Sequence, residues 1–446
     1  MKTKTELFIR DLGDGLILRH ASVDDADALA TMNSIMHSDD GPDKPNERIG
    51  TWTRDLLAPN HPTTRPSDFT IIEETATGRI VSTLCLIPQT WTYEGVEFGV
   101  GRPELVSTLP EFRNRGLVRV QMEEVHKWSE ERGHLAQVIT GIPYFYRQFG
   151  YDMALNLAGR RYGFEPHVSV LKEGEQETYR IRPAVEADAD FVLRIYRENE
   201  KRYAISCQRT LENILYEMKG QSQENINHFD VMIIETADGT PVGFFQHATE
   251  LWFFGLYCTY YGLEKGVSWL EVSPAVVRYL WKKGGEYAAR DSQTRDSFGF
   301  SLGEQHPVYE ALEDKLPVTR SPYAYYIRVP DLSAFLKHVK PALEKRLAES
   351  VAVGYTGELK LNFYRSGMRM VFERGLITSI EPMKIASETQ ADANFPDLTF
   401  LHLVFGHRSL DELRHAFVDC YLTNHTARVL LNALFPKRQS SVFSIY

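Results

Sequence analysis

The stretch from Val106 to Val118 contains the first residues whose types and spacing could do chemistry. An apolar run stops at Pro110, a basic turn follows, and a helical pattern begins after Gly116. A strand, a turn and a helix in this order present free backbone N–H groups and the positive end of a helix dipole to an anion. Gly116 lets a phosphate approach the backbone closely, and Arg113 and Arg115 add positive charge. This pattern predicts a phosphate site, and a basic surface turn is the alternative.

A second block lies downstream, from Pro143 to Tyr151, and reads Pro-Tyr-Phe-Tyr-Arg-Gln-Phe-Gly-Tyr. The interval between the two blocks leaves room for the helix and for one further strand, residues 136–140. Two such blocks in a fixed order are far more specific than either one. Within the second block, Tyr144 and Tyr151 are expected to be packing residues.

Together the two blocks resemble the Gcn5-related N-acetyltransferase (GNAT) family. That family has an acyl-coenzyme A loop, Arg/Gln-x-x-Gly-x-Gly/Ala, and a later block, Pro-x-Phe-Tyr-x-x-x-Gly-Phe/Tyr. Val118 stands where the family has Gly or Ala, so helix and phosphate are expected to sit slightly apart. The resemblance implies acetyl-coenzyme A as co-substrate and no metal ion. The implied coenzyme-binding residues are Val106, Ser107, Thr108, Arg113, Asn114, Arg115, Gly116, Leu117 and Val118.

The resemblance also implies a reaction, in which an amine attacks the thioester directly while both substrates are bound. Catalysis is then mostly orientation, together with one proton removed from the amine and one given to the thiolate. Tyr146 is the expected acid, because a phenol with a pKa of about 10 carries its proton at neutral pH. The alternative is that Tyr146 only packs. A backbone N–H near Val106 to Thr108 is expected to polarise the thioester carbonyl.

Composition limits the class of protein. A chain of 446 residues predicts two or three domains. No run approaches the roughly 20 apolar residues of a membrane span, and the N-terminus shows no apolar signal region. The formal charge of −10 argues against nucleic acid as a partner and is compatible with a cationic substrate. Four scattered cysteines without ligand spacing predict buried free thiols in a reducing cytoplasm.

The first unit is expected to span residues 1–165. It should contain an edge strand from Leu16 to Ala21, a capped helix after it, and a hairpin around Thr77 and Gly78. An acidic loop, residues 37–48, follows the helix. It is either a solvated connection or a lip that binds the acceptor.

The chain then repeats itself weakly. Residues 18–27 align with residues 181–190, and Phe69 to Glu73 align with Val231 to Glu235. This order of elements indicates a duplicated fold in residues 178–330. The second copy has no phosphate loop, so it is predicted to be a GNAT-like unit without coenzyme, in which Tyr309 is structural.

A third unit is expected over residues 331–446. One amphipathic helix from Leu332 to Leu347, three short strands and three further helices predict an α+β unit. This unit resembles the sterol-carrier-protein-like domain, although its apolar residues are more simply a core than a lipid tunnel. The predicted fold class is therefore α/β and α+β: tandem GNAT folds, each a mixed sheet flanked by helices, followed by a sterol-carrier-protein-like domain.

This order of units resembles the enhanced intracellular survival (Eis) acetyltransferases. The resemblance implies a homohexamer, and it implies that the C-terminal carboxylate, here of Tyr446, serves as base. A carboxylate with a pKa of about 3.5 is a poor base for an ammonium unless burial raises that pKa, so it could instead bind the ammonium. The leading hypothesis is an N-acetyltransferase acting on an aminoglycoside, a polyamine or a lysine. The alternative is a non-catalytic protein that holds a lipid or a partner.

Overall fold

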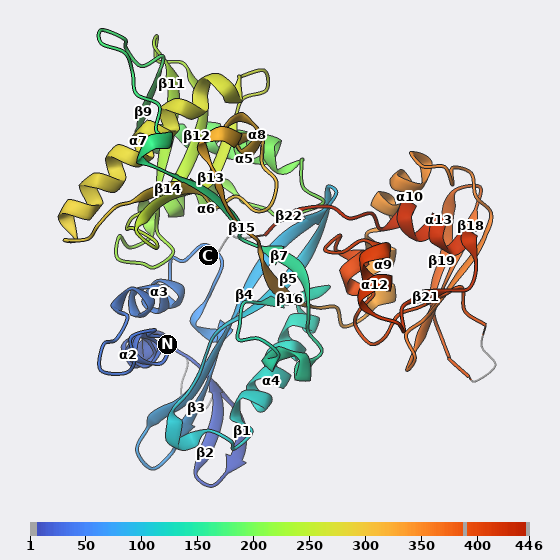
Figure 1. Ribbon diagram of the computed structural model, residues 1–446. Helices are drawn as coiled ribbons and strands as arrows, with labels where there is room; N and C mark the ends of the chain where they lie inside the picture. The colour runs from blue at the N-terminus through green and yellow to red at the C-terminus, as the bar shows by residue number, and fades with distance from the viewer. Residues whose placement is uncertain (1–6, 387–389, 443–446) are drawn as a thin grey trace.

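The computed structural model describes residues 7–386 and 390–442, and it contains three β-sheets (Figure 1). The sheets have ten, seven and five strands. Helices flank all three. The prediction of mixed sheets flanked by helices is confirmed.

The first sheet has the order β1-β2-β3-β4-β5-β6-β16-β7, and β10 and β22 extend it beside β4. Helices α2 and α3 pack on one face, against Ile71 and Cys85, while α4 packs on the opposite face, against Leu84 and Leu86. The predicted edge strand, β2, lies inside the sheet, because β1 pairs with its outer side. The strands are β1 (Phe8–Gly13), β2 (Leu16–His20), β3 (Phe69–Glu74), β4 (Arg79–Tyr93), β5 (Val96–Thr108), β6 (Ala136–Ile139), β7 (Asp152–Leu157), β10 (Ile205–Cys207), β16 (Tyr323–Arg328) and β22 (Ser440–Ser441). The helices are α2 (Ala26–Met36), α3 (Glu47–Leu57) and α4 (Leu117–Glu131).

The second sheet has the order β15-β8-β14-β13-β12-β11-β9. Its strands are β8 (Arg160–Phe164), β9 (Tyr179–Pro183), β11 (Phe229–Thr236), β12 (Pro241–Ala248), β13 (Gly255–Leu263), β14 (Ser297–Phe300) and β15 (Val318–Arg320). The accompanying helices are α5 (Ala189–Glu200), α6 (Leu211–Leu215), α7 (Trp269–Arg290) and α8 (Pro307–Ala311). Helix α7 takes the place in this unit that α4 takes in the first.

A repeated ion-pair cluster supports the duplication. In both units an arginine on the strand before the first helix joins an aspartate at the start of that helix to a glutamate on the neighbouring strand of the sheet. The three residues are Arg19, Asp25 and Glu73 in the first unit and Arg182, Asp188 and Glu235 in the second. The Arg–Asp distance is 2.7 Å in the first unit and 2.6 Å in the second. Two copies of one buried or half-buried network at matching positions are what a duplicated fold predicts.

The two units exchange a strand. Strand β8 lies within residues 1–165 of the sequence, yet it pairs with β14 and β15 of the second sheet. Strand β16 closes the second unit in sequence, yet it lies between β6 and β7 of the first sheet. Residues 160–164 and 323–328 therefore lie in sheets on the other side of the boundaries expected from sequence. Neither sheet is complete without a strand from the other unit.

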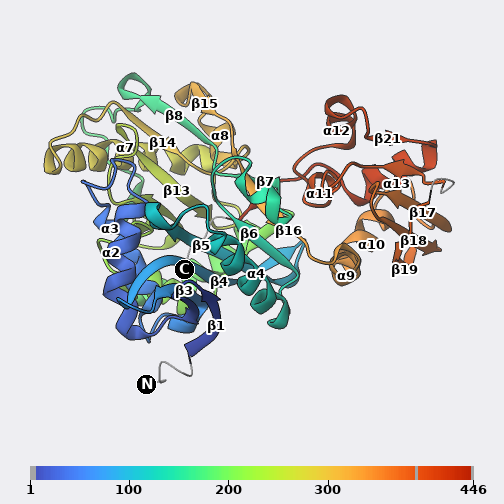
Figure 2. The same cartoon turned by 90° about the horizontal axis from the view of Figure 1, so that it is seen from below.

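The third unit stands apart from the other two in both views (Figures 1 and 2). Its sheet has the order β19-β18-β17-β20-β21. The single helix predicted from Leu332 to Leu347 is two helices, because Pro341 lacks an N–H and disfavours a continuous helix. The strands are β17 (Gly357–Asn362), β18 (Gly367–Glu373), β19 (Leu376–Met383), β20 (Ala393–Asn394) and β21 (Tyr421–Leu422). The helices are α9 (Leu332–His338), α10 (Lys340–Ala348), α11 (Leu401–Val404), α12 (Leu410–Ala416) and α13 (His425–Leu434).

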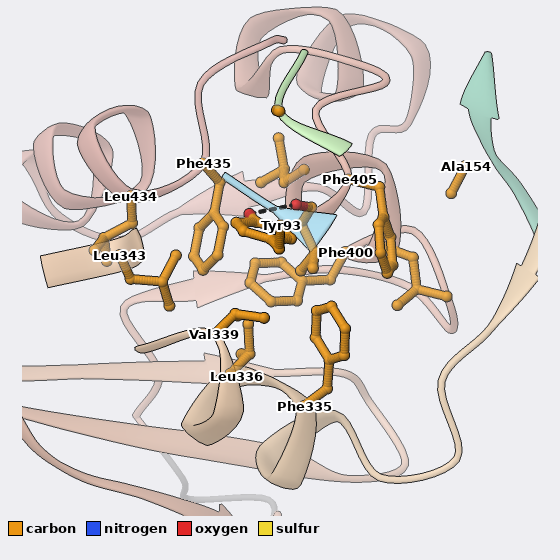
Figure 3. Packing of buried hydrophobic residues seen from close by; sticks show 14 of the residues in the cluster. Tyr93, Ala154, Phe335, Leu336, Val339, Leu343, Phe400, Phe405, Leu434 and Phe435 are labelled. Carbon is orange, nitrogen blue, oxygen red and sulfur yellow. Dashed lines mark hydrogen bonds between the residues drawn. The ribbon is translucent and has the colours of Figure 1, made fainter. Parts of the chain in front are cut away.

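Tyr93, at the end of β4, joins the third unit to the first. Its hydroxyl donates to the Val404 carbonyl at 2.7 Å, and its ring packs edge-on against Phe335 (Figure 3). Arg346 donates to the Tyr93 hydroxyl at 2.9 Å and pairs with Glu94 at 3.0 Å. One continuous apolar core therefore runs from β4 and β5 into the third unit.

The final described residues return from the third unit to the interface between the first two. Strand β22 runs parallel to β10, and β10 pairs with the end of β4. Val442 is buried. All four cysteines are buried and free, as predicted. Within residues 7–386 and 390–442, no helix is long and apolar enough to cross a membrane.

Candidate active site

A cleft of about 760 Å³ opens where β5 and β6 separate. The two strands pair in parallel only at Val100 with Ala136 and at Gly101 with Gln137. Beyond these pairs, the edge of β5 faces the gap instead of a neighbouring strand. We call this cavity the β5–β6 cleft. The predicted residues that line it are Val106, Ser107, Thr108, Arg113, Asn114, Gly116, Leu117, Val118 and Tyr146.

A bulge in β5 shapes one wall of this cleft. Thr83 pairs with Ser107 and Cys85 pairs with Glu104, so two residues of β5 stand opposite Leu84 alone. Leu105, within the bulge, has φ of +52°. A bulge interrupts the alternation of backbone groups along a strand. The bulge lies at the place where the sequence predicts an N–H that polarises a carbonyl.

The start of α4 forms the opposite end of the cleft. Gly116 is the N-cap residue with φ of +75°, a conformation that favours glycine. No side chain caps the helix, and no acidic residue lies in its first turn. A Cβ at position 116 would meet nothing within 4 Å. Free N–H groups, a helix dipole and open space fit a phosphate group.

The arginines of the turn differ in their placement. Arg113 lines the cleft, and its Nε donates to the Thr108 carbonyl at 3.4 Å. Arg115 is outside the lining residues and lies 3.5 Å from the Asp14 carboxylate. Arg119, which sequence reasoning missed, lines the cleft one turn into α4 and donates to Gln148 at 2.8 Å. Its position three residues after Gly116 places it in the first turn of the helix, and this could have identified it from the sequence as a further basic residue beside the phosphate site.

Tyr146 lies at the inner end of the cleft and is 6% exposed. Its ring packs edge-on against Tyr326, which β16 supplies from the other unit, at a centroid distance of 5.6 Å. Burial, with a smaller effect of the Glu104 charge, raises the pKa of Tyr146 well above its usual value. The phenol therefore keeps its proton at neutral and moderately alkaline pH. Tyr151 packs in the core as expected, whereas Tyr144 does not pack, because it is 80% exposed.

Glu104 is the second functional candidate that sequence reasoning missed. It is buried, lines the cleft and precedes the predicted Val106–Thr108 segment by two residues. Its Oε1 accepts from Arg102 at 2.8 Å and from Thr140 at 3.1 Å. A carboxylate held in this way beside Tyr146 can bind an ammonium or accept its proton. Side chains alternate between the two faces along a strand, and this alternation could have placed Glu104 at the cleft. The bulge at Leu105 interrupts it.

His37 begins the acidic loop and also lines the cleft. Its Nε2 lies 2.8 Å from the Ser107 hydroxyl, which donates to Asn33 at 3.0 Å. Since that hydroxyl has a single proton, His37 Nε2 carries the hydrogen of their contact and Nδ1 is left as an acceptor. Burial lowers the pKa of His37, so the ring is neutral at pH 7. The exposed part of the loop, with Asp39, Asp40 and Asp43, is outside the lining residues.

The predicted base, the carboxylate of Tyr446, lies outside the described residues. The chain can be followed to Val442, which is buried beside β10 at the interface of the first two units. Within the described ranges, no group of three His, Cys, Asp or Glu side chains could hold a metal ion.

The second unit offers a contrast at the start of α7. Ser268 caps this helix by accepting from the Glu271 N–H at 3.4 Å, and Glu271 places a negative charge in the first turn. Both features oppose phosphate binding. Tyr309 is tied to the backbone, since its hydroxyl donates to the Phe300 carbonyl at 3.0 Å. The geometry agrees with a second unit that binds no coenzyme.

Comparisons with known proteins identify the first unit. Residues 29–154 match the model of the acetyltransferase (GNAT) domain, a range that includes both sequence blocks. The prediction of a GNAT acetyltransferase domain is confirmed, and the chain carries this enzyme domain. No curated protein matches the sequence.

Solved structures share the fold over almost the whole chain. A probable N-acyltransferase of unknown function from Enterococcus faecalis V583 has a TM-score of 0.66 at 14% identity, covering 97% of this chain and 100% of that one. A GCN5-related N-acetyltransferase from Kribbella flavida has a TM-score of 0.61 at 16% identity, covering 97% and 98%. Eis1 from Mycobacterium abscessus has a TM-score of 0.58 at 13% identity, covering 97% and 100%. The three-unit architecture is therefore shared with structures that include an Eis protein.

Proposed function

We propose that this protein is an acetyl-coenzyme A dependent N-acetyltransferase that transfers an acetyl group to a primary amine. The observation that carries the proposal is the β5–β6 cleft. It joins the uncapped start of α4, the bulged edge of β5 and the buried Tyr146 in one cavity. The α4 N–H groups and Arg113 bind the pyrophosphate, and the edge of β5 receives the pantetheine arm as a missing strand.

In the proposed reaction the amine nitrogen attacks the thioester carbonyl carbon, and the C–S bond breaks. Backbone N–H groups at the β5 bulge stabilise the oxygen of the carbonyl as negative charge develops on it. Tyr146 gives its proton to the departing thiolate. Of the two protons that the ammonium loses, one goes to solvent and the other restores Tyr146. Most of the rate enhancement comes from holding the amine and the thioester together.

Two carboxylates are proposed for the amine side. Glu104 is inside the cleft and is fixed by Arg102 and Thr140, which supports a role in binding the ammonium or accepting its proton. The Tyr446 carboxylate remains the second proposal. It is supported by the course of β22, which brings the chain end back to the first unit, and four residues beyond Val442 can span at most about 14 Å.

An acetyl-transfer screen over aminoglycosides, polyamines and lysine peptides, read out by released thiol, tests the function. We expect thiol release to depend on one of these amine classes and acetyl-coenzyme A to bind once per chain. Copurified lipid together with no coenzyme affinity would instead favour the alternative, a lipid- or partner-binding protein.

Assembly and location are further proposals. A homohexamer is supported by the exposed apolar side chains of Phe253, Phe254 and Leu270 on the second unit, and light scattering tests it. A cytoplasmic location is supported by the four free thiols.

A further inference from the structure

A second cavity of about 160 Å³ lies between the second unit and residues 156–158 and 439–442, at the place in that unit that corresponds to the β5–β6 cleft. Strands β13 and β14 pair from Gly255 with Ser297 to Cys258 with Phe300. Beyond the last pair, Thr259 to Tyr261 and Ser301 to Glu304 line the space between them. We call this space the β13–β14 cavity. It shares no lining residue with the β5–β6 cleft.

Coenzyme A is excluded from this cavity by the start of α7. Trp269, in the first turn, packs edge-on against Tyr261 at 4.7 Å and against His306 at 5.1 Å between ring centroids. These rings pack at the start of α7, the position that corresponds to the phosphate site of the first unit. The cavity beside them is of a size comparable to one that holds benzene, about 150 Å³.

Glu200, at the end of α5, has an unsatisfied oxygen in the cavity lining. The residue is 4% exposed. Its Oε1 accepts from the Ser441 hydroxyl of β22 at 3.4 Å, whereas no donor in residues 7–386 and 390–442 reaches its Oε2. A buried carboxylate oxygen without a donor costs free energy, and a bound donor would recover it.

The other charged groups around Glu200 are already engaged. Arg209 donates to Glu217 at 3.3 Å and lies over the Tyr196 ring at 4.6 Å. Gln246 donates to the same Glu217 carboxylate at 2.9 Å. Arg202 donates to the Asn199 carbonyl at 2.8 Å, and the neutral His306 ring lies 3.1 Å from the Tyr261 carbonyl. The same cavity is lined by the aromatic side chains Tyr196, Tyr203, Phe229, Trp252, Tyr260 and Tyr261.

We propose that the β13–β14 cavity binds a small organic cation, a primary ammonium on an apolar or aromatic body. The ammonium donates to Glu200 Oε2, and the aromatic walls hold the body and favour the cation. The two guanidinium groups in the lining are already engaged, by Asn199 and by Glu217, which leaves Glu200 to the cation. This site is separate from the transferase cleft, so the proposal does not depend on the proposed function.

The test uses the full chain without coenzyme and two probes of nearly equal shape, phenethylammonium and phenethyl alcohol. Calorimetry should show one ammonium site per chain outside the transferase cleft, and the alcohol should bind at least tenfold more weakly. Burial raises the pKa of Glu200 to about 8, so ammonium binding should release a proton below that pH. Affinity should then fall by up to about tenfold per pH unit below pH 7, while a primary ammonium stays charged.

Glu200→Gln should weaken ammonium binding at least tenfold and abolish proton release. Glu198→Gln is the matched control, because Glu198 lies on the same helix and pairs with Lys201 at the surface. It should leave binding unchanged, and thermal unfolding checks that both variants fold. Equal binding of the two probes, or binding without proton release, would overturn the proposal on wild-type protein alone, even if Glu200→Gln failed to fold. Unchanged ammonium affinity in folded Glu200→Gln would also overturn it.

Discussion

Gly141 and Tyr146 are in contact so close that the ring fits only against a glycine. A Cβ at position 141 would lie 2.1 Å from the Tyr146 Cε2 and 2.7 Å from its Cδ2. Both neighbours are ring atoms of a buried side chain, which cannot give way without moving the ring. The position of the Tyr146 hydroxyl in the cleft therefore depends on a residue that has no side chain.

The first prediction follows from this contact. Gly141→Ala should displace the Tyr146 ring, lower turnover by about tenfold or more and leave coenzyme affinity near wild type. Steady-state kinetics and coenzyme titration measure both. Added to Tyr146→Phe, the same change should cause no further loss of turnover, because the group it misplaces is already absent. A further tenfold loss in the double variant would show that Gly141 acts through something else.

The second prediction concerns coenzyme binding. Gly116→Glu should abolish the single acetyl-coenzyme A site, since it puts a side chain and a negative charge where the phosphates are proposed to lie. Gly266→Glu is the matched control, because Gly266 has φ of +92°, has open space around it and precedes the capped start of α7. Isothermal titration should find one site in this control. Coenzyme binding that survives Gly116→Glu contradicts the assignment of the site.

The third prediction concerns the proton donor. Tyr146→Phe should lower turnover by roughly 10²-fold or more without weakening coenzyme binding. Because burial raises the pKa of Tyr146, wild-type turnover should show no alkaline loss from phenol ionisation up to about pH 10. Tyr309→Phe, the corresponding change in the second unit, should leave turnover unchanged. If Tyr146→Phe kept full turnover over the whole pH range, Tyr146 would not be the proton donor.

The fourth prediction separates the two carboxylates proposed for the amine side. Adding one glycine after Tyr446 moves the terminal carboxylate by about 3.5 Å of chain, and a misplacement of 1 Å can cost about 10²-fold. If this carboxylate is the base, the extended protein should lose turnover although every side chain is still present. If Glu104 has the role, Glu104→Gln should lose turnover or raise the acceptor KM while the extended protein works normally.

Exposed Glu97 on the same strand provides the control, and Glu97→Gln should change neither kinetic constant. The stability of Glu104→Gln should be measured by denaturant unfolding alongside its kinetics, because breaking a buried ion pair costs about 3–5 kcal/mol. Normal activity in both test proteins would contradict the proposed mechanism. Attention would then turn to Asp39, Asp40 and Asp43.

The fifth prediction concerns stability below pH 6.5. Burial lowers the pKa of His126 to about 3, and its ring lies 2.8 Å from the Tyr151 hydroxyl. In the unfolded chain this histidine takes a proton below about pH 6.5. Between these values the unfolded state binds one proton more, so stability falls as the pH falls, by up to about 1.4 kcal/mol per pH unit. Urea unfolding at pH 7, 6 and 5 measures how the free energy of unfolding changes with pH. In His126→Gln this change should correspond to one proton fewer than in the wild type, whereas exposed His415→Gln should leave it unaltered.

The sequence predicts the first cleft better than it predicts the sheets. The residues from Val106 to Val118 and the Pro143–Tyr151 block are local signals, set by turns and helix ends, and both segments contribute lining residues to one cleft. Strands β8 and β16 are different, because their residue patterns fit either sheet and only the packing of two units decides between them. Glu104 was missed for a related reason: the bulge at Leu105 changes which side of β5 faces the cleft.

Because of the exchanged strands, the first and second units depend on each other for their structure. Gln137 and Arg328 are paired in one sheet although they are 191 positions apart in sequence. Residues 1–165 expressed alone would have a gap between β6 and β7, beside the Tyr146 block. Deletion of the second unit would therefore damage the first, however little chemistry the second performs. The second unit is therefore needed for the structure of the first whether or not it binds a ligand of its own.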